Sequence, residues 1–357
     1  PDLYADHDAT LPLLHWQLFS RYFIFDPQRG IWNLIYLDRP DTQIKTVDKV
    51  WSEMRNILNL DLNATPEINS AATDLEIIQT PDKAHFHRIL RKCLDYIAAG
   101  DIYQANLSAE WLVRTTINPY QIYQNMIALS PAAYCAFVRF GEHSVCSISP
   151  ELFIARRGDE LLTQPIKGTR SRHLDDPIAD NRNRDDLLQS PKDRSELAMI
   201  VDLLRNDLGK VCIPGSVRVI DRRRMEAHPT VWHTSAQITG TLKSGPTSRW
   251  AALVAGVCPG GSISGVPKIR AMEIIAELER RPRGIYCGNI GWIHPNGDGV
   301  LNIAIRTLHI FRSMVRISAG SGIVAESDPE EEFAEIHAKA FALLKALHVD
   351  IQAPVTR

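Results

Sequence analysis

The sequence predicts an α+β fold with large antiparallel β-sheets packed together and helices on the outside. Strand-like segments follow one another as hairpin neighbours and do not alternate strictly with helices, as they would in a doubly wound fold. Residues 134–148 read as one hairpin, and residues 285–325 contain at least three strands with Asn296-Gly297 as a turn. An amphipathic segment over residues 81–99, ended by Gly100, predicts one of the covering helices.

The first 75 residues differ from the rest in pattern. Residues 15–26 and 30–38 are aromatic and alternating, and a turn-like PQRG links them, so we expect a hairpin. A helix is expected over residues 47–60, and a polar passage follows over residues 63–80. We place a domain boundary near residue 75.

A highly charged stretch lies in the middle of the chain. Residues 173–196 are so rich in Asp, Arg and Lys that we expect a surface loop there. The apolar periodicity of residues 195–209 predicts a helix directly after this loop. The charged stretch therefore leads into a helix that opens with acidic residues.

The composition excludes several classes of protein. With 357 residues, 45% hydrophobic and 23% charged, the chain has the make-up of a globular protein. Its net charge of −2 argues against a nucleic-acid partner, and no apolar run is long enough to span a membrane. The six cysteines show no C-x-x-C pair, which favours reduced thiols and a cytoplasmic location.

Two acidic pairs occur at helical spacing. Asp193 and Glu196 are three residues apart, and so are Glu332 and Glu335 in a helix opened by Asp328-Pro329. If the two helices face each other, four carboxylates form an oxygen-only site that suits Mg²⁺. The alternative is that each pair is a solvated helix face, neutralised by nearby cations.

A glycine-rich segment enters another helix over residues 259–281. Its glycines allow close approach of the backbone, its serines offer hydroxyls, and Pro267 presets the first helical turn, so an anion is expected there. The segment matches neither the P-loop motif G-x-x-x-x-G-K-[ST] nor the dinucleotide-binding motif G-x-G-x-x-G. A carboxylate is therefore a more natural ligand than a nucleotide.

Residues 256–260 formally match G-x-C-x-G, the nucleophile-elbow motif of a cysteine-dependent glutaminase. Pro259 removes the N–H that the oxyanion hole would need directly after Cys258. We therefore expect Cys258 to be a small packed residue rather than a nucleophile.

Several motifs in order along the chain resemble those of the chorismate-utilising family, which includes anthranilate, isochorismate, salicylate and aminodeoxychorismate synthases. The motifs lie at residues 100–108, 149–153, 165–169, 192–209, 261–275, 286–292, 301–307 and 319–335. The resemblance implies that residues 76–357 form the chorismate-binding catalytic domain. Residues 1–75 resemble only part of the family's N-terminal segment.

The resemblance also implies the ligands of the site. It implies that Glu332 and Glu335, with Asp193 and Glu196, surround a Mg²⁺ ion that holds one carboxylate of chorismate. Because many relatives have glutamate at position 193, the shorter Asp193 is expected to act through water. The residues implied around the second, enolpyruvyl carboxylate and the ring are Tyr286, Arg306, Gly322, Lys339, Ser262 and His233. Arg306, Tyr286 and His233 each also admit an ordinary structural role.

The same resemblance implies the chemistry. Glu151 would be the general acid that protonates the leaving C4 hydroxyl. The water-using relatives carry a lysine where this chain has Gln104, and a neutral amide cannot serve as that base. In the ammonia-using branch, Lys167 is typical of aminodeoxychorismate synthase component I, in which this lysine is proposed to attack ring C2.

The implied reaction converts chorismate and ammonia to 4-amino-4-deoxychorismate, the precursor of p-aminobenzoate for folate. Ammonia is expected from a separate glutamine amidotransferase subunit, because the chain shows no convincing glutaminase motif. Two alternatives remain open: an anthranilate synthase component I with an unusual lysine, and a non-catalytic ligand-binding relative.

Overall fold

The computed structural model describes residues 11–26, 29–36, 49, 52–53, 74–228, 231–245 and 249–349. Contacts divide the chain into two units, residues 1–71 and residues 72–357. In the first unit, β1 (Arg21–Asp26) pairs with the antiparallel β2 (Ile31–Tyr36), which confirms the expected hairpin. The helix expected over residues 47–60 lies mostly outside the described residues.

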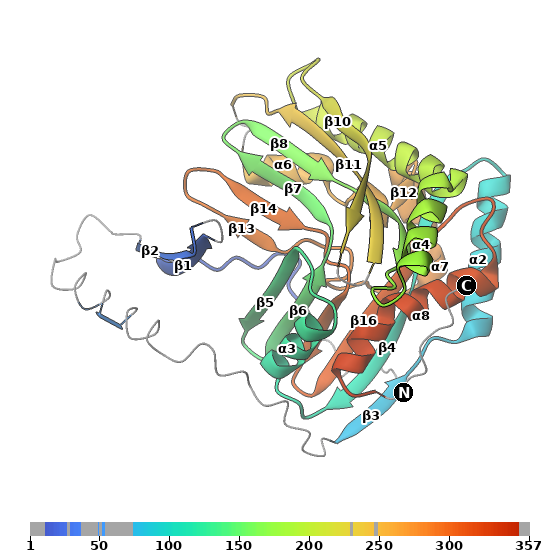
Figure 1. Cartoon of the computed structure of the whole chain (residues 1–357), viewed down its shortest axis with the longest axis horizontal. Helices are drawn as coiled ribbons and strands as arrows, with labels where there is room; N and C mark the ends of the chain where they lie inside the picture. Colours follow the sequence, from blue (N-terminus) through green and yellow to red (C-terminus); the bar gives the residue numbers. More distant parts are fainter. Residues whose placement is uncertain are drawn as a thin grey trace. The chain divides into compact units, whose positions relative to one another are not determined.

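The second unit contains two antiparallel sheets, each of seven strands in the part of the chain that the structure describes. The β11 sheet occupies the upper part of the view in Figure 1. Its strands in spatial order are β10 (Arg218–Ala227), β11 (Val231–Thr241), β8 (Glu160–Gln164), β7 (Leu152–Arg157), β14 (Gly299–Asn302) and β13 (Gly291–Ile293), with β9 (Ile166–Ser171) also paired to β11. The expected α+β fold with large antiparallel sheets is confirmed.

The β4 sheet occupies the lower part of the same view. Its strands in spatial order are β12 (Gly265–Val266), β4 (Gln104–Thr115), β16 (Met314–Ile323), β15 (Thr307–Phe311), β6 (His143–Ser149) and β5 (Tyr134–Phe140), with β3 (Leu75–Gln79) also paired to β4. Most of β4 is buried, because it lies between neighbouring strands and under helices. The strand β3 falls within the stretch expected to be a polar passage, so that expectation was wrong at its end.

Helices cover both sheets. Those against the β4 sheet are α2 (Lys83–Ala98), α3 (Pro119–Leu129), α7 (Lys268–Glu279) and α8 (Pro329–Ala346). Those near the β11 sheet are α4 (Pro177–Gln189), α5 (Pro191–Val211) and α6 (Trp250–Val257), and a short 3₁₀ turn, η2 (Gly261–Ile263), contacts α5. Side-chain caps begin several of them: Asp82 accepts two backbone N–H bonds at the start of α2, and Asp328 does the same for α8.

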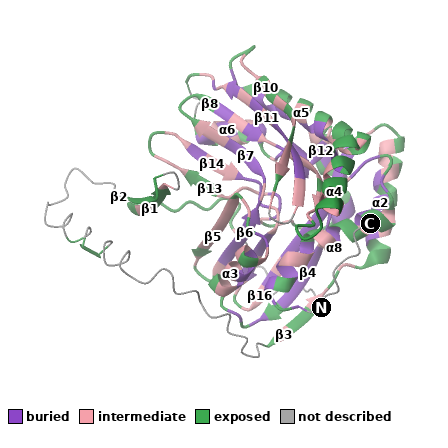
Figure 2. Cartoon of the chain, in the orientation of Figure 1, coloured by how far each residue is buried: buried purple, intermediate pink, exposed green. Residues whose placement is uncertain are grey.

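Each sheet has its own apolar core. In the β4 sheet, Leu107 and Val113 pack in one buried cluster with Ile274 of α7 and Ile336 of α8. A second cluster joins β7 and β11 to residues of α5 and α6. Figure 2 shows the corresponding buried residues along the strands of both sheets.

The prediction of a loop over residues 173–196 is wrong, because this stretch contains α4 and the start of α5. Asp176 caps α4 by accepting from the N–H groups of Ile178 and Ala179, and Pro177 occupies its first turn. The helix buries little apolar surface, so its apolar periodicity is weak. Ion pairs of Asp186 with Arg170 and of Asp180 with Arg172 attach it to β9 and the residue that follows it.

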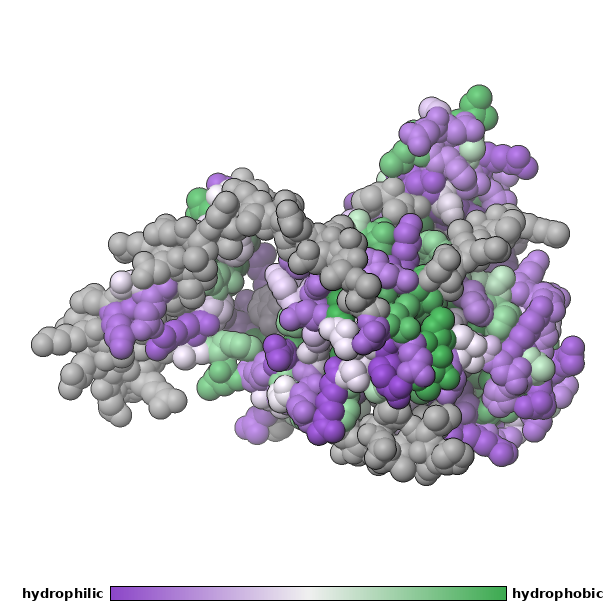
Figure 3. Space-filling view, turned by 90° about the horizontal axis from the view of Figure 1, so that it is seen from below, coloured by the Kyte–Doolittle hydropathy of each residue, from purple (hydrophilic) through white to green (hydrophobic). Residues whose placement is uncertain are grey.

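The surface is mixed in character. Hydrophilic residues cover much of the face shown in Figure 3, where apolar residues form a smaller area. Exposed apolar side chains include Ile178 of α4 and Ile269 of α7. Among the described residues, the structure contains no helix with the length and apolarity needed to cross a membrane.

The α7 helix offers a matched test of core packing. Ile274 is 0% exposed in the core, whereas Ile269 of the same helix is 76% exposed. We expect Ile274→Ala to lower the free energy of unfolding by about 2–5 kcal/mol, because it leaves a cavity. Ile269→Ala should change it by less than about 0.5 kcal/mol in the same denaturant titration. Equal losses would contradict this assignment of the core.

Candidate active site

Two of the segments in which the chain passes between the sheets are hydrogen-bonded to each other. The first crossing, residues 150–151, joins β6 to β7, and the second, residues 303–306, joins β14 to β15. The N–H of Ile303 donates to the carbonyl of Glu151 at 3.1 Å, and the carbonyl of Arg306 accepts from β6, also at 3.1 Å. These bonds fix Glu151 and Arg306 relative to each other at the junction of the sheets.

Glu151 is almost fully buried, with 4% of its surface exposed. The Ser262 hydroxyl donates to its Oε1 at 2.7 Å. Burial raises the pKa of Glu151 to about 7, although the Ser262 bond and the positive charges of Lys167 and Lys339 oppose this rise. The carboxyl therefore changes protonation close to neutral pH, which suits an acid catalyst.

Lys167 lies in β9 and points into the interior of the site. Its Nζ is 3.3 Å from Glu196 Oε2, and the two side chains are only 13% and 14% exposed. A Cβ atom on Gly322 would lie 3.1 Å from this Nζ and 2.8 Å from Nε2 of Gln104, so glycine is needed for this close approach. The amide of Gln104 is buried, and neither of its polar atoms has a hydrogen-bond partner.

Gly168 allows β9 to lie close to α4 and α5. Its φ of +77° is in the left-handed region, where glycine carries no steric cost. A Cβ atom there would lie 2.7 Å from Leu187 Cδ1 of α4 and 2.9 Å from Asp193 Oδ1 of α5. Any larger residue would push the Lys167 strand away from the start of α5.

Each of the four carboxylates expected to hold a metal is paired with a cation. The pairs are Glu196 with Lys167, Asp193 with Arg170 at 3.2 Å, Glu332 with Lys192 at 3.8 Å, and Glu335 with Lys339 at 2.6 Å. Among the described residues, no three His, Cys, Asp or Glu side chains are grouped so that they could hold a metal ion. Three lysines and one arginine thus supply positive charge to these carboxylates.

The electrostatics nevertheless link these acids. Burial, and then the charge of Glu335, raise the pKa of Glu332, although Ser327 donates to Glu332 Oε1 at 2.6 Å. Burial opposes ionisation of Glu335 as well, but Lys339, followed by Lys167 and Lys192, lowers its pKa. Glu332, Glu335 and Lys339 of α8 therefore interact with Lys167 of β9 and Lys192 of α5. The donor set is oxygen-only, as a hard cation requires.

Arg306 carries an uncompensated charge. Its φ of +48° is in the left-handed region, which is strained for a non-glycine residue. Burial alone lowers the pKa of its guanidinium, and no carboxylate among the described residues pairs with it. Burial, and then the charges of Arg306 and His228, lower the pKa of His233 to about 3, and neither ring nitrogen of His233 has a partner. A buried guanidinium beside a neutral imidazole is suited to an anionic guest.

The side chains of Tyr286 and Lys339 both lie at Gly320 of β16. Tyr286 is 6% exposed, and a Cβ atom on Gly320 would lie 2.8 Å from its hydroxyl. Lys339 Nζ donates to the carbonyl of Gly320 at 2.9 Å. Two residues farther along β16 lies Gly322, next to Lys167, so this strand connects the Tyr286 side of the site to the Lys167 side.

The Ser262 loop, residues 257–264, is anchored at its start by a buried ammonium. Lys268 Nζ donates to the carbonyls of Val257 at 2.9 Å and Pro259 at 2.7 Å. It also pairs with Asp207 of α5 at 2.5 Å. The glycine-rich segment is thus held in place by a cation on α7.

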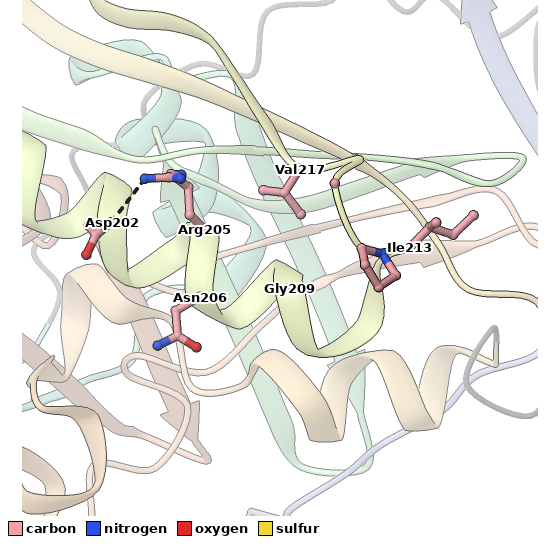
Figure 4. Close-up of a pocket in the computed structure, with 8 residues that line it drawn as sticks. Asp202, Arg205, Asn206, Gly209, Ile213 and Val217 are labelled. Atoms are coloured by element: carbon pink, nitrogen blue, oxygen red, sulfur yellow. Dashed lines mark hydrogen bonds and ion pairs between the residues drawn. The ribbon is translucent and has the colours of Figure 1, made fainter.

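Cys258 does not pack as expected. It is exposed, and its Sγ lies 3.6 Å from Asn289 Oδ1. The expectation of a small packed residue was wrong, because Cys258 directly follows the end of α6 and its side chain is exposed there. Two hollows beside α5, of about 440 and 630 Å³, also lie away from the predicted residues. The smaller hollow, shown in Figure 4, is lined by Asp202, Arg205, Asn206 and Val217 among others.

The structure thus brings together Lys167, Glu196 and Gly322, and separately Glu151 with Ser262. Sequence analysis did not single out Lys268, Lys192 or Gly320 as site residues. Each lies inside or beside a motif that was recognised, so the signal was their position next to residues already chosen. Their contacts could not be read from local spacing, because each one joins two separate elements.

Comparison with known proteins identifies the family. Aminodeoxychorismate synthase component 1 of Bacillus subtilis is 34% identical over 344 residues, which cover 96% of this chain and 72% of that protein. Anthranilate synthase component 1 1 of Haloarcula marismortui is 42% identical over 252 residues, covering 71% and 51% respectively.

The solved structure of anthranilate synthase component I from Streptococcus pneumoniae superposes with a TM-score of 0.80 at 29% identity, covering 91% of this chain and 72% of that chain. It therefore supports the antiparallel architecture independently of the motifs. The profile of the chorismate binding enzyme family matches residues 2–345, and the chain belongs to this family.

Proposed function

We propose that the chain is component 1 of an aminodeoxychorismate synthase, which converts chorismate and ammonia to 4-amino-4-deoxychorismate. The observation that carries the proposal is Lys167, a buried lysine placed beside Glu196, Gln104 and Gly322. A relative named aminodeoxychorismate synthase component 1 aligns over 96% of the chain, which supports the same activity. The neutral Gln104 offers no base to activate water, which favours ammonia as the nucleophile.

Lys167 and Glu151 divide the chemistry. The neutral Lys167 amine bonds from Nζ to ring C2 while the C4–O bond breaks, and a proton from Glu151 makes the leaving hydroxide water. Ammonia then bonds to C4 as the C2–Nζ bond breaks. The new ammonium returns one proton to Glu151, so the net change is chorismate plus ammonia to product plus water.

The remaining residues orient the dianion. In this proposal the buried Arg306 guanidinium binds one carboxylate, and Tyr286, Lys339 and the backbone of Gly322 also contact that carboxylate. His233 stays neutral and can line the ring without adding charge. Ser262 holds the Glu151 carboxyl by its hydroxyl bond.

Glu196, Glu332 and Glu335 are the proposed ligands of Mg²⁺, and Asp193, held by Arg170, would act through water. The raised pKa of Glu332 shows a buried carboxylate in need of positive charge, which fits this assignment. A Mg²⁺ ion bound there would hold one carboxylate of chorismate.

Ammonia is proposed to come from a glutamine amidotransferase subunit, since the relatives are named as first components of such synthases. An anthranilate synthase remains the second candidate, because relatives with that name are 39–42% identical over shorter stretches. Only the product separates the two, since anthranilate formation releases pyruvate whereas the proposed product keeps the enolpyruvyl group.

We expect the intact chain to form aminodeoxychorismate from chorismate, ammonium salt and Mg²⁺. Lys167→Ala should lose about 10³-fold or more in kcat, because the nucleophile is gone. Lys345→Ala, which removes a lysine near the end of α8, should retain full activity as a control. Chromatography with mass detection identifies the product; an unimpaired Lys167→Ala enzyme would remove the nucleophile assignment, and release of pyruvate would favour the second candidate.

The acid role of Glu151 predicts a pH dependence. Since the protonated form is required and its pKa is about 7, kcat/KM should fall as pH rises through neutrality. Glu151→Gln should lose about 10²-fold or more in kcat, and this descending limb should be absent from its profile. A limb that persists unchanged in Glu151→Gln would assign the acid to another group.

The metal assignment predicts a change in Mg²⁺ dependence. Activity should vanish with a chelator and return with Mg²⁺. Glu332→Gln should raise the Mg²⁺ concentration for half-maximal activity about 10-fold or more, because a direct oxygen ligand is weakened. Glu330→Gln, on the same helix but paired with Lys83 at the surface, should leave this concentration unchanged. Equal behaviour of the two variants would contradict the ligand set.

A further inference from the structure

Arg283 and Glu279 form a buried, bidentate ion pair behind the Ser262 loop. Arg283 Nη2 is 2.7 Å from Glu279 Oε1, and Nε is 2.9 Å from Oε2. The Glu279 side chain is 1% exposed and that of Arg283 is 16% exposed. Removing either charge alone would leave the other buried without a partner, so the two act as a unit.

The pair takes the place of a neighbouring strand along one edge of β4. The short β12 pairs only with Gln104 and Ala105. Beyond it, Glu279 Oε1 accepts from the N–H of Ser108 at 2.8 Å, and Arg283 donates to the carbonyl of Asn106. The ion pair therefore satisfies backbone groups that would otherwise be buried without partners.

The same guanidinium holds the end of the Ser262 loop. Arg283 Nη1 donates to the carbonyl of Ile263 at 3.0 Å, one residue after Ser262. The N–H of Asn106 donates to the carbonyl of Ser264 at 2.8 Å, which joins the loop to β4. Arg283 thus holds the backbone next to Ser262, and the Ser262 hydroxyl donates to the carboxylate of Glu151.

We infer that Arg283, held by Glu279, is a positioning residue that sets the Ser262 hydroxyl against the carboxyl of Glu151. It touches neither reacting atoms nor Glu151 itself. Its action passes through the backbone of Ile263 to the neighbouring Ser262. The inference rests on the proposed function only in taking Glu151 as the acid.

The test compares Arg283→Lys, Ser262→Ala and the double variant. Lysine keeps the positive charge but cannot reach Glu279, Ile263 and Asn106 together as the planar guanidinium does. Arg316→Lys is the matched control, because Arg316 is also a partly buried arginine and pairs with the buried Glu110 at 3.3 Å. Circular dichroism and thermal unfolding establish that each variant is folded.

The decisive readout is the titration of Glu151 without substrate, followed by NMR of ¹³C-labelled glutamate and assigned with Glu151→Gln. The charged groups that act on Glu151 are Lys167 on β9 and Lys339 on α8, and no variant alters them. Since the Ser262 bond lowers the pKa of Glu151, Ser262→Ala should raise it. Arg283→Lys should shift it the same way, and the double variant should show no further shift.

Kinetics provide the second readout. Arg283→Lys should lower kcat by up to about 10²-fold while KM changes less than about threefold, as expected for misplacement of a catalytic group. Glu279→Gln, which keeps an acceptor for Ser108, should act in the same direction if Arg283→Lys is unstable. The inference is overturned if Glu151 titrates as in the parent protein, if the shifts of the two substitutions add, or if Arg316→Lys gives the same shift.

Failure of the two proposals is distinguishable. If the chain makes no aminodeoxychorismate but the Glu151 titration shifts as expected, the positioning role stands and the proposed reaction falls. If the product forms but Arg283→Lys leaves the titration unchanged, the reaction stands and the positioning role falls.

Discussion

The site depends on two of the segments that cross between the sheets, residues 150–151 and residues 303–306. The N–H of Ile303 donates to the carbonyl of Glu151, and the N–H of Ile148 donates to the carbonyl of Arg306, so backbone hydrogen bonds hold these segments where the sheets meet. Those bonds place Glu151 and Arg306, one from each crossing, within a single rigid frame. Because both residues lie where strands end, their side chains are free of the ladder and available for a ligand.

Several ion pairs lie at the candidate site. Isolated buried charges cost far more than the marginal stability of a folded protein, and each of the four candidate carboxylates, Asp193 and Glu196 on α5 and Glu332 and Glu335 on α8, meets a lysine or arginine. Arg306 is the exception, since its guanidinium has no carboxylate partner among the described residues. A dianionic guest would supply that missing charge, which gives the binding site a physical reason for its strain and burial.

The backbone around the site is shaped by close approaches. Gly320 and Gly322 let β16 pass next to Tyr286, Gln104 and Lys167, and Gly168 lets β9 pass next to α5. Buried cations then hold the loop opposite: Lys268 at its start and Arg283 at its end. The side chains proposed for catalysis are therefore placed by buried groups on neighbouring elements, which is how rigid scaffolds commonly position reactive atoms.

Local pattern alone determined the antiparallel hairpins, the helix before Gly100, the acidic pairs at three-residue spacing and the family motifs that contain Lys167 and Glu151. It missed α4, because a helix held by ion pairs to another element has little apolar periodicity, and it misplaced Cys258, whose exposure depends on how a loop turns. Only the tertiary structure decided which cation pairs with which carboxylate. It also decided that Ser262 donates to Glu151 and that Arg283 donates to the carbonyl of Ile263, next to Ser262. Contacts of this kind join residues far apart in the sequence, as the bond between Arg283 and Asn106 does across 177 positions, and sequence spacing carries no information about distances set by sheet packing.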